Sequence, residues 1–384
     1  MSPSTSRPTV GLMATLLSTA PSYRGAGIHQ YSQALLTFLP QQAPHFHYHA
    51  FLMDRGFAPA GLTPHYPARL SAKPWQRILW EQLQVARLAR RLELALLHGF
   101  AYALPLAAPM PKVVTVHDLT FLRFPQAFPR TRRHYLARMT ALSCRRARVV
   151  IADSKATAHD LQALLQVPAE KIVVVYPGVD ARYRPLPERA VEAYRAKKQW
   201  PDRFILMVGT LEPRKNHLGL IEAYAIYRGL AQRPLPLVIG GGKGWHYRQI
   251  FQRVQALGLE QHVHFLGFVP WEDLPWLYNA ATLFVYPSRY EGFGLPVAEA
   301  MRCGVPVITS NASSLPEVAG HAAITIDPNE PEALARAMWT VTEKEPERLA
   351  AMREQGIHHA QQFQWERAAA QTARVYARAL HDHA

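Results

Sequence analysis

The stretch EGFGLPVAEAMRCGVPVITS, residues 291–310, carries two glutamates eight positions apart, with glycines and a proline between them. The apolar run TLFVYPS before it predicts a strand, and Pro296 suits the first turn of a helix. VAEAMRC then predicts the helix, Gly304 its end and VPVITS the next strand. This order places Glu291 before the helix and Glu299 in its second turn.

The same alternation of apolar runs and helical patterns extends along the whole chain and predicts the fold class. Strands that alternate with helices predict parallel α/β sheets covered on both faces, and here the pattern occurs twice. We therefore predict two doubly wound domains, residues 1–183 and 184–366, which face a central cleft and are joined at the polar segment 180–190. The predicted strands are PTVGLMAT, FHYHAFLM, KVVTVHD, RVVIADS and KIVVVYPGVD in the first half, and FILMVGTL, LPLVIGGG, VHFLGFV, TLFVYPS and VPVITS in the second.

Length and composition agree with a folded two-domain protein. A chain of 384 residues is too long for one hydrophobic core, and 49% hydrophobic with 18% charged residues excludes a disordered chain. Cys144 and Cys303 are too few for a disulfide framework and predict a reducing, cytoplasmic compartment. We interpret VGLMATLLSTA near the start as a buried strand rather than a signal peptide. No run approaches the roughly 20 apolar residues that span a bilayer.

The positive charge is concentrated in the first half of the chain. Residues 1–183 contain 21 Lys and Arg against 8 Asp and Glu, which gives +13, and the remaining 22 against 20 give +2, for a total of +15. Eight arginines and no acidic residue lie between Leu119 and Ala152. A one-sided field of this kind attracts an anionic partner, either nucleic acid or anionic lipid.

Two loops of the first half carry candidate functional residues. Gly25 and Gly27 precede a predicted helix, where they either let backbone N–H groups approach a phosphate or form a simple tight turn. His117 follows a predicted strand and is a candidate for hydrogen bonding or proton transfer. Asp118 beside it can orient the ring or cap the following turn.

In the second half, GTLEPRKNHLGL places Arg214 and Lys215 between a strand and a helix. Cations are unfavourable at the positive end of a helix unless an anion joins them, so the pair predicts a diphosphate site rather than an exposed surface pair. The glycines of VIGGGKGWHY permit either a close ligand approach or a tight turn, and they lack the spacing of a nucleoside triphosphate loop.

The two glutamates of residues 291–310 suit vicinal sugar hydroxyls, because each carboxylate offers two acceptor oxygens. For Glu299 the alternative is a solvated helix position. The apolar neighbours Val297, Ala298 and Met301 favour a buried helix and therefore a functional carboxylate.

Together, the spaced glutamates around GFGLP, the GTLEPRKN loop, VTVHD and YRGAGIHQYS resemble the retaining glycosyltransferases of family 4. The resemblance covers the whole chain and implies the GT-B architecture of two Rossmann-like domains, with the last helix, about 367–384, packed back on the first domain. It implies that Arg214, Lys215, Glu291 and His117 serve catalysis without a metal or other cofactor. The donor-binding residues that it implies are Gly27 and Arg214 with Lys215 at the diphosphate, Val269 near the base, Glu299 at the ribose, and Glu291 with Phe293, Gly294 and Leu295 at the sugar.

The resemblance also implies substrates and partners. The HDL and EGFGLP contexts resemble bacterial mannosyltransferases, so GDP-mannose is the first expected donor, UDP-glucose the alternative, and a glycan or lipid-linked molecule the acceptor. The basic helix near 131–147, with Tyr135, Leu136, Met139 and Leu142 in one stripe, either faces the core or contacts an anionic membrane from the cytoplasmic side. A GT-B sugar epimerase and a nucleic-acid-binding protein remain as rival classes, but no nucleic-acid partner is expected.

Overall fold

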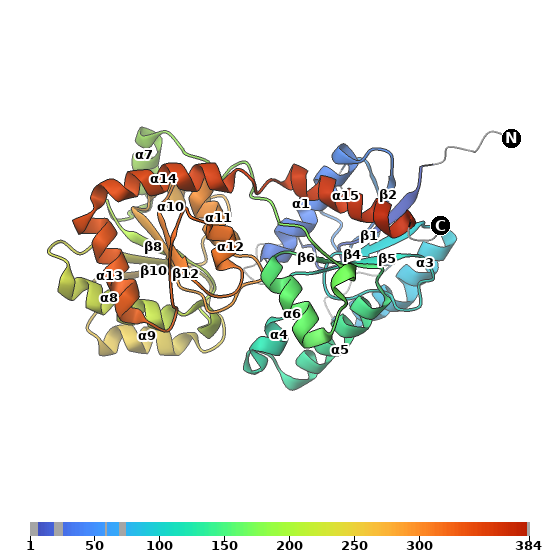
Figure 1. The fold of residues 1–384 in the computed structure, drawn as a ribbon, viewed down its shortest axis with the longest axis horizontal. Coiled ribbons are helices and arrows are strands. Elements are labelled where there is room, and N and C mark those ends of the chain that lie inside the picture. The colour runs from blue at the N-terminus through green and yellow to red at the C-terminus, as the bar shows by residue number, and fades with distance from the viewer. Residues whose placement is uncertain (1–6, 19–25, 58–59, 69–73, 382–384) are drawn as a thin grey trace. The chain divides into compact units, whose positions relative to one another are not determined.

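The computed structural model describes residues 7–18, 26–57, 60–68 and 74–381. The chain divides into two compact units (Figure 1). Unit 1 comprises residues 1–178 and 364–384, and unit 2 comprises residues 179–363. Each unit contains one parallel sheet with helices on both faces, as the alternating pattern of the sequence predicts. The predicted arrangement of the domains around a cleft stays a prediction.

Unit 1 is built on a seven-stranded parallel sheet in the order β3-β2-β1-β4-β5-β6-β7. Its strands are β1 (Thr9–Met13), β2 (His47–Phe51), β3 (Leu62–His65), β4 (Leu96–Gly99), β5 (Lys112–Val116), β6 (Val149–Ala152) and β7 (Ile172–Val174). Its helices are α1 (Ala26–Gln42), α2 (Pro74–Leu79), α3 (Ala86–Arg91), α4 (Thr120–Arg123), α5 (Arg130–Arg146), α6 (Lys155–Leu165) and α15 (Trp365–His381), with a π-helical segment, Trp80–Val85, between α2 and α3 and 3-10 turns at Pro125–Ala127 and Ala169–Lys171.

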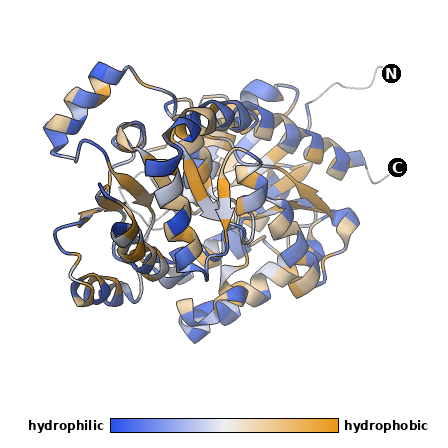
Figure 2. Ribbon diagram, turned by 60° about the vertical axis from the view of Figure 1, so that its left-hand side comes forward, coloured by the Kyte–Doolittle hydropathy of each residue, from blue (hydrophilic) through white to orange (hydrophobic). Residues whose placement is uncertain are grey.

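Successive residues of each strand fill two different cores, because side chains alternate between the faces of a sheet. Val113 of β5 packs in a core that includes residues of α1 and α15. Val114 packs in a core with Cys144 of α5 and Leu161 of α6. Figure 2 shows hydrophobic strands in the interior and hydrophilic outer faces of the helices. The run VGLMATLLSTA begins as the buried strand β1, as predicted, and its last two residues lie outside the described part.

The last helix, α15, packs along α1 of unit 1. A chain of buried hydrogen bonds fixes it to the sheet. The hydroxyl of Tyr376 lies 2.7 Å from Nδ1 of His98, the Nε2 of His98 lies 2.9 Å from Oγ1 of Thr115, and Thr115 in turn lies 2.9 Å from the hydroxyl of Tyr31. Residues 364–381 therefore form part of the first unit, although they follow the second in sequence.

Unit 2 is built on a six-stranded parallel sheet in the order β10-β9-β8-β11-β12-β13. Its strands are β8 (Ile205–Val208), β9 (Leu237–Gly240), β10 (Val263–Gly267), β11 (Leu283–Tyr286), β12 (Val307–Ser310) and β13 (Ile324–Ile326). Its helices are α7 (Glu188–Lys198), α8 (His217–Leu230), α9 (Tyr247–Ala256), α10 (Leu274–Ala280), α11 (Leu295–Arg302), α12 (Leu315–Ala319), α13 (Pro331–Trp339) and α14 (Pro346–Ala360), with a 3-10 turn at Pro213–Lys215 and a π segment at Thr340–Lys344.

The division between the units falls five residues before the boundary that we place after residue 183. Tyr183 belongs to unit 2 because its ring packs edge-on against Tyr278, with ring centroids 5.9 Å apart. Gly178 ends unit 1 beside the point where the chain returns, since a Cβ atom added there would lie 2.2 Å from the backbone nitrogen of Trp365. The two crossing segments thus lie side by side.

Candidate functional site

The cation pair of unit 2 lies in the 3-10 turn between β8 and α8. Asn216 follows it with a φ of 61°, a left-handed conformation that asparagine tolerates, and its side chain donates to the carbonyl of Pro328 at 2.7 Å. Lys215 is only 9% exposed. The interpretation of Arg214 and Lys215 as an exposed surface pair is therefore wrong.

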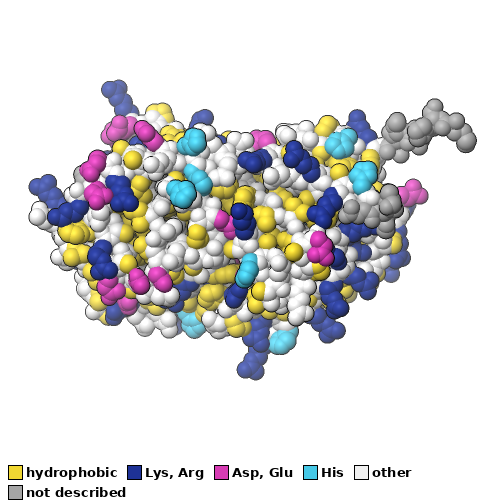
Figure 3. Space-filling model, in the orientation of Figure 1, with side chains coloured by type: hydrophobic (Ala, Val, Ile, Leu, Met, Phe, Trp, Pro, Cys, Tyr) yellow, Lys and Arg dark blue, Asp and Glu magenta, His cyan; other side chains and the backbone are white. Residues whose placement is uncertain are grey.

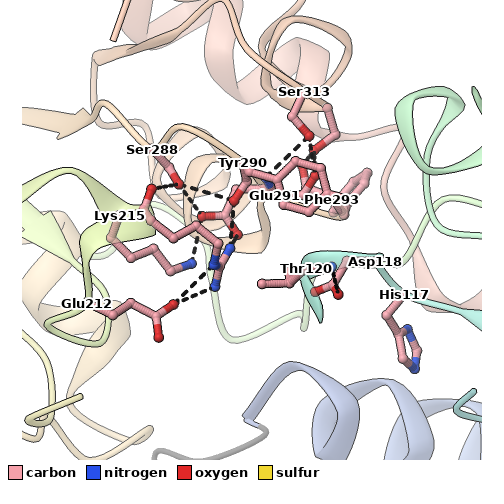
Figure 4. A network of polar contacts seen from close by, with 12 residues as sticks. His117, Asp118, Thr120, Glu212, Lys215, Ser288, Tyr290, Glu291, Phe293 and Ser313 are labelled. Atoms are coloured by element: carbon pink, nitrogen blue, oxygen red, sulfur yellow. Dashed lines mark hydrogen bonds and ion pairs between the residues drawn. The ribbon is translucent and has the colours of Figure 1, made fainter. Parts of the chain in front are cut away.

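Glu291 lies directly against these two cations (Figure 4). Its Oε1 accepts from Nζ of Lys215 at 2.7 Å, and its Oε2 accepts from Nη1 of Arg214 at 2.8 Å. Glu212 accepts two further hydrogen bonds from the guanidinium of Arg214, at 2.8 and 3.1 Å. Two cations at the start of a helix require an anion beside them. In the folded chain the carboxylates of Glu291 and Glu212 supply this negative charge.

Two hydroxyl groups that sequence reasoning does not single out complete the network. Oγ of Ser288 donates to Oε1 of Glu291 at 2.6 Å. The hydroxyl of Tyr286 accepts from Lys215 at 2.6 Å and donates to the same carboxylate oxygen at 2.9 Å. The segment YPS carries both hydroxyl groups at the end of β11. The local sequence does not connect them with Lys215, because that contact depends on the order of the strands in the sheet.

The charges around Glu291 fix its protonation state. Burial alone would raise its pKa, but Arg214 and Lys215 together lower it to about 2. Burial, reinforced by the neighbouring Arg214, lowers the pKa of Lys215. Glu291 is therefore an anion at neutral pH, and its pairing with two cations makes it a weak base.

The glycine loop between the two glutamates has a defined conformation. Gly294 adopts a φ of 105° as the N-cap of α11, and Pro296 follows in the first turn, as predicted. The hydroxyl of Ser314 donates to the carbonyls of Glu291 and Phe293, at 3.0 and 2.7 Å. The loop that includes Leu295 is thereby held before any ligand arrives, and its predicted contacts with a donor sugar stay a prediction.

Glu299 lies in the second turn of α11, as predicted, and is 6% exposed, so its interpretation as a solvated residue is wrong. The hydroxyl of Tyr278 donates to its Oε2 at 3.1 Å. Burial and then the Glu299 carboxylate raise the pKa of Tyr278 and of Tyr183 well above the ordinary value. Sequence reasoning misses these tyrosine partners, which come from α10 and from the start of unit 2.

Two further loops of unit 2, after β9 and after β10, contain residues that the sequence analysis singles out. A Cβ atom added at Gly241 would lie 1.9 Å from the carbonyl oxygen of Gly209, so this glycine is explained by a close approach of the backbone to the end of β8. Val269 is half-buried after β10, and its Cγ2 lies 2.9 Å from the position of a Cβ atom on Gly240. The predicted contact of Val269 with a nucleotide base stays a prediction.

In unit 1, His117 is buried and both its ring nitrogens face acceptors. Nδ1 lies 2.7 Å from Oδ2 of Asp153, and Nε2 lies 2.8 Å from the carbonyl oxygen of Phe100. A carbonyl can only accept, so Nε2 carries a proton, while Nδ1 faces a carboxylate oxygen of Asp153. Burial alone would lower the pKa of His117, but Asp153, together with Asp118 and the carbonyl of Phe100, outweighs burial and the pKa is raised. The arrangement therefore favours the imidazolium.

Asp118 does not orient this ring. Its Oδ1 accepts from the backbone nitrogen of Thr120 at 2.9 Å, which is the capping role considered as the alternative (Figure 4). Gly27 is the exposed second residue of α1, so it lies inside the helix and not before it. Gly25 lies outside the described residues.

Within the described ranges, no group of three or more His, Cys, Asp or Glu residues could hold a metal ion. Among the helices of the described residues, none has the length and the apolar composition that a membrane span requires. Cys144 and Cys303 are both buried and free. The predicted absence of a metal from the reaction stays a prediction.

Comparison with solved structures shows that the two units have the GT-B fold. Sucrose-phosphate synthase from Thermosynechococcus elongatus matches with a TM-score of 0.76 at 21% identity, over 97% of this chain and 99% of that chain. HepE from Anabaena, solved in complex with UDP and glucose, matches with a TM-score of 0.74 at 22% identity, over 96% and 99% of the two chains. At these identities the likeness concerns the fold alone.

Sequence comparison identifies the family. The model of glycosyl transferases group 1 matches residues 190–359, and the model of glycosyltransferase family 4 matches residues 26–183. The O-antigen chain mannosyltransferase B of Escherichia coli is 36% identical over 265 residues, which cover 69% of this chain and 69% of that protein. The chain belongs to glycosyltransferase family 4.

Proposed function

We propose that this glycosyltransferase is a retaining mannosyltransferase that uses GDP-mannose and extends a glycan or lipid-linked acceptor in bacterial polysaccharide assembly. Its similarity to the E. coli O-antigen chain mannosyltransferase B favours mannose as the transferred sugar. The observation that carries the chemistry is the cation pair between β8 and α8, the half-buried Arg214 and the buried Lys215, which Glu212 and Glu291 hold in place.

The cations act on the leaving nucleotide. Cleavage of the sugar–phosphate bond increases negative charge on the diphosphate, and donors already fixed in place stabilise that charge without reorganisation. Glu291 and Glu212 neutralise the cations in the absence of donor, so the diphosphate shares Arg214 and Lys215 with these carboxylates when it binds. We propose that no metal is needed at this step.

We assign Glu291 a positioning role rather than that of a covalent nucleophile. Its Oε1 accepts three hydrogen bonds, and its pKa of about 2 marks a weakly basic carboxylate. To attack the sugar, the Glu291 carboxylate would have to break its contacts with Arg214 and Lys215. The leaving diphosphate needs these two cations most at the same step. Retention by attack on the same face of the sugar is therefore the pathway that these contacts favour. We propose that His117 of unit 1, whose raised pKa favours the imidazolium, also acts on the donor sugar.

The alternative donor is UDP-glucose, which would leave the same diphosphate chemistry unchanged. A thermal-shift panel of GDP-, UDP-, ADP- and dTDP-sugars distinguishes the two and tests the proposal at its base. We expect GDP-mannose to give the largest stabilisation, and Glu299→Ala to abolish most of it if this carboxylate holds the ribose. Glu260→Ala, an exposed carboxylate of the same unit, is the matched control. Stabilisation by none of the nucleotides would refute the function.

We also propose that the protein works at the cytoplasmic face of an anionic membrane, where a lipid-linked acceptor lies. The stripe predicted on α5 is half-buried, and its Leu136 packs against the core, which agrees with the core-facing interpretation.

A second apolar stripe of unit 1, on the helix 74–91, is more exposed. Trp75, Leu79 and Leu83 recur every four residues along the helix 74–91 and are 55%, 49% and 49% exposed.

Charge complementarity selects an anionic surface for this helix. Arg87, Arg90 and Arg91 continue it, and all three are exposed. Tyr135 of α5 lies close enough to Glu81 and Arg77 of the helix 74–91 for their charges to act on it. The arginine-rich α5 is therefore a neighbour of the helix 74–91. On the face shown in Figure 3, Lys and Arg side chains gather over the region where Figure 1 places α3 and α5. Apolar side chains flanked by arginines are typical of helices that lie in a membrane interface.

A further inference from the structure

A row of buried aromatic rings in unit 2 connects the two glutamates of the segment 291–310. Tyr278 of α10 lies edge-on to Phe284 of β11, with ring centroids 5.4 Å apart and an angle of 72° between the rings. Phe284 stacks on Tyr286, two residues further along β11, at 5.8 Å and 17°. Tyr183 extends the row at its other end, edge-on to Tyr278 at 5.9 Å. These four residues form one continuous aromatic row, from the start of unit 2 to the end of β11.

The hydroxyl groups of the aromatic row bond to both carboxylates. At one end, Tyr278 donates to Oε2 of Glu299 at 3.1 Å. At the other end, Tyr286 donates to Oε1 of Glu291 at 2.9 Å and accepts from Nζ of Lys215 at 2.6 Å. The two tyrosines are eight residues apart, as are the two glutamates, and they pair in nested order. Each glutamate is therefore held by a tyrosine of the same row.

Tyr183 places a second phenol beside Glu299. Burial, then the negative charge of Glu299 and a hydrogen bond to it, raise the pKa of Tyr183 well above its ordinary value. Burial and the same carboxylate raise the pKa of Tyr278. Both phenols therefore keep their protons at neutral pH, and both are available as donors to the carboxylate.

The aromatic row leaves its members little freedom to move. All four side chains are at most 1% exposed. Edge-on and stacked rings at these distances have the geometry that aromatic pairs favour, and a close-packed interior resists displacement. A glutamate side chain, by contrast, samples several rotamers unless a partner fixes it, and fixing it costs entropy. Hydroxyl groups on rigid rings therefore hold the two carboxylates in place before a ligand arrives.

We propose that Tyr278 and Tyr286 are positioning residues, which hold the two carboxylates through the aromatic row at the separation that lets one nucleotide sugar reach both. The proposal rests on the proposed function, because it takes Glu299 to bind the ribose and Glu291 to hold the sugar. Neither tyrosine needs to touch the donor. Tyr278 acts on the ribose hydroxyls through Glu299, whereas Tyr286 acts on the diphosphate and the sugar through Lys215 and Glu291.

The test compares the binding of GDP and of 2′,3′-dideoxy-GDP, which lacks both ribose hydroxyls, by titration calorimetry on the full chain. We expect Tyr278→Phe to weaken GDP roughly fivefold, as loss of one hydrogen bond does, and to leave the dideoxy nucleotide unaffected. Tyr286→Phe should weaken both nucleotides by the same factor, because it acts at the diphosphate. Tyr224→Phe is the matched control, since it removes a buried hydroxyl that donates to the carbonyl of Leu235 at 3.0 Å in the same unit. It should bind both nucleotides as the wild type does.

A merely structural role of Tyr278 would not make its effect depend on the ribose hydroxyls. Equal weakening of the two nucleotides by Tyr278→Phe, or unchanged binding of GDP, overturns the proposal, while binding of GDP to the wild type leaves the proposed function standing. If the wild type does not bind GDP, the proposed function fails and this proposal with it. If Tyr278→Phe does not fold, Tyr183→Phe decides, since it removes the other phenol beside Glu299. We expect the same dependence on the ribose hydroxyls, and its absence would overturn the proposal.

Discussion

The ammonium of Lys215 donates to the carboxylate of Glu291 at 2.7 Å, although the two residues are 76 positions apart in sequence. The contact joins the turn after β8 to the loop after β11, two strands that are neighbours in the sheet. Because Arg214 contacts the same carboxylate, the candidate leaving-group site and the candidate sugar-binding residue form one electrostatic unit. Changes at either position should therefore affect both stability and donor binding.

Replacement of Lys215 by methionine should lower the turnover number by about two orders of magnitude, because a fixed donor to the leaving group is lost. It should also destabilise the chain by about 2–4 kcal/mol, since a buried carboxylate loses one of its two cationic partners. Activity with GDP-mannose and urea denaturation measure the two effects.

Lys198→Met is the matched control, because it removes the same charge from an ion pair with Asp273 in the same unit. Lys198 is far more exposed, so its loss should change the stability by less than about 1 kcal/mol and leave turnover intact. Equal effects of the two substitutions would contradict a special role for Lys215.

The pKa of Glu291 predicts how stability depends on pH. The folded value of about 2 lies below the ordinary 4.5, so the ionised group adds stability above pH 4.5 that is lost as the pH falls toward 2. We expect the difference in unfolding free energy between wild type and Glu291→Gln to shrink by about 3 kcal/mol over that range. A constant difference across the range would mean that the carboxylate is not held by the cations.

The periodic pattern of the sequence predicts the two sheets because parallel strands buried on both faces form short apolar runs. It cannot predict which runs become neighbours. The pairing of β8 with β11 brings Glu291 to Lys215, and the register that places Val116 beside Ala152 brings His117 to Asp153. Both contacts depend on the order of strands and not on local sequence.

Glu81, a buried glutamate of the π-helical segment Trp80–Val85, shows a second limit of the sequence. WEQLQVARL has neither glycines nor a recognised motif, and a glutamate in a helix is usually solvated. In the folded chain Glu81 is nevertheless buried, in a π segment whose Gln82 bonds to the backbone of Leu104 and Leu106. By contrast, Gly294 and Pro296 act locally, and their roles at the start of α11 follow from residue type.

At pH 6.5 more than half of His117 should be imidazolium, because Asp153, together with Asp118 and the Phe100 carbonyl, outweighs the effect of burial on its pKa. A raised pKa means that the pair contributes its full stability below pH 6.5 and loses it as the pH rises through the folded value. In Asp153→Asn the burial effect should dominate, and the ring should be neutral at pH 6.5. Nitrogen-15 shifts of the imidazole measure this, with the exposed His159 as a reference in the same spectra. A neutral His117 in the wild type at pH 6.5 would contradict the assignment.

The exposed stripe on the helix 74–91 predicts where the protein contacts a membrane. Replacing Trp75, Leu79 and Leu83 by serine removes apolar surface that would enter the lipid interface, so co-sedimentation with anionic vesicles at low salt should fall roughly tenfold or more. Leu164→Ser is the control, since Leu164 is 38% exposed in unit 1 but lies on α6. Nucleotide-induced thermal shifts should stay unchanged in both proteins, because none of the predicted donor-binding residues lies on the helix 74–91 or on α6. Equal sedimentation of the triple variant and the wild type would exclude this helix as the contact, and no binding of the wild type would exclude the membrane.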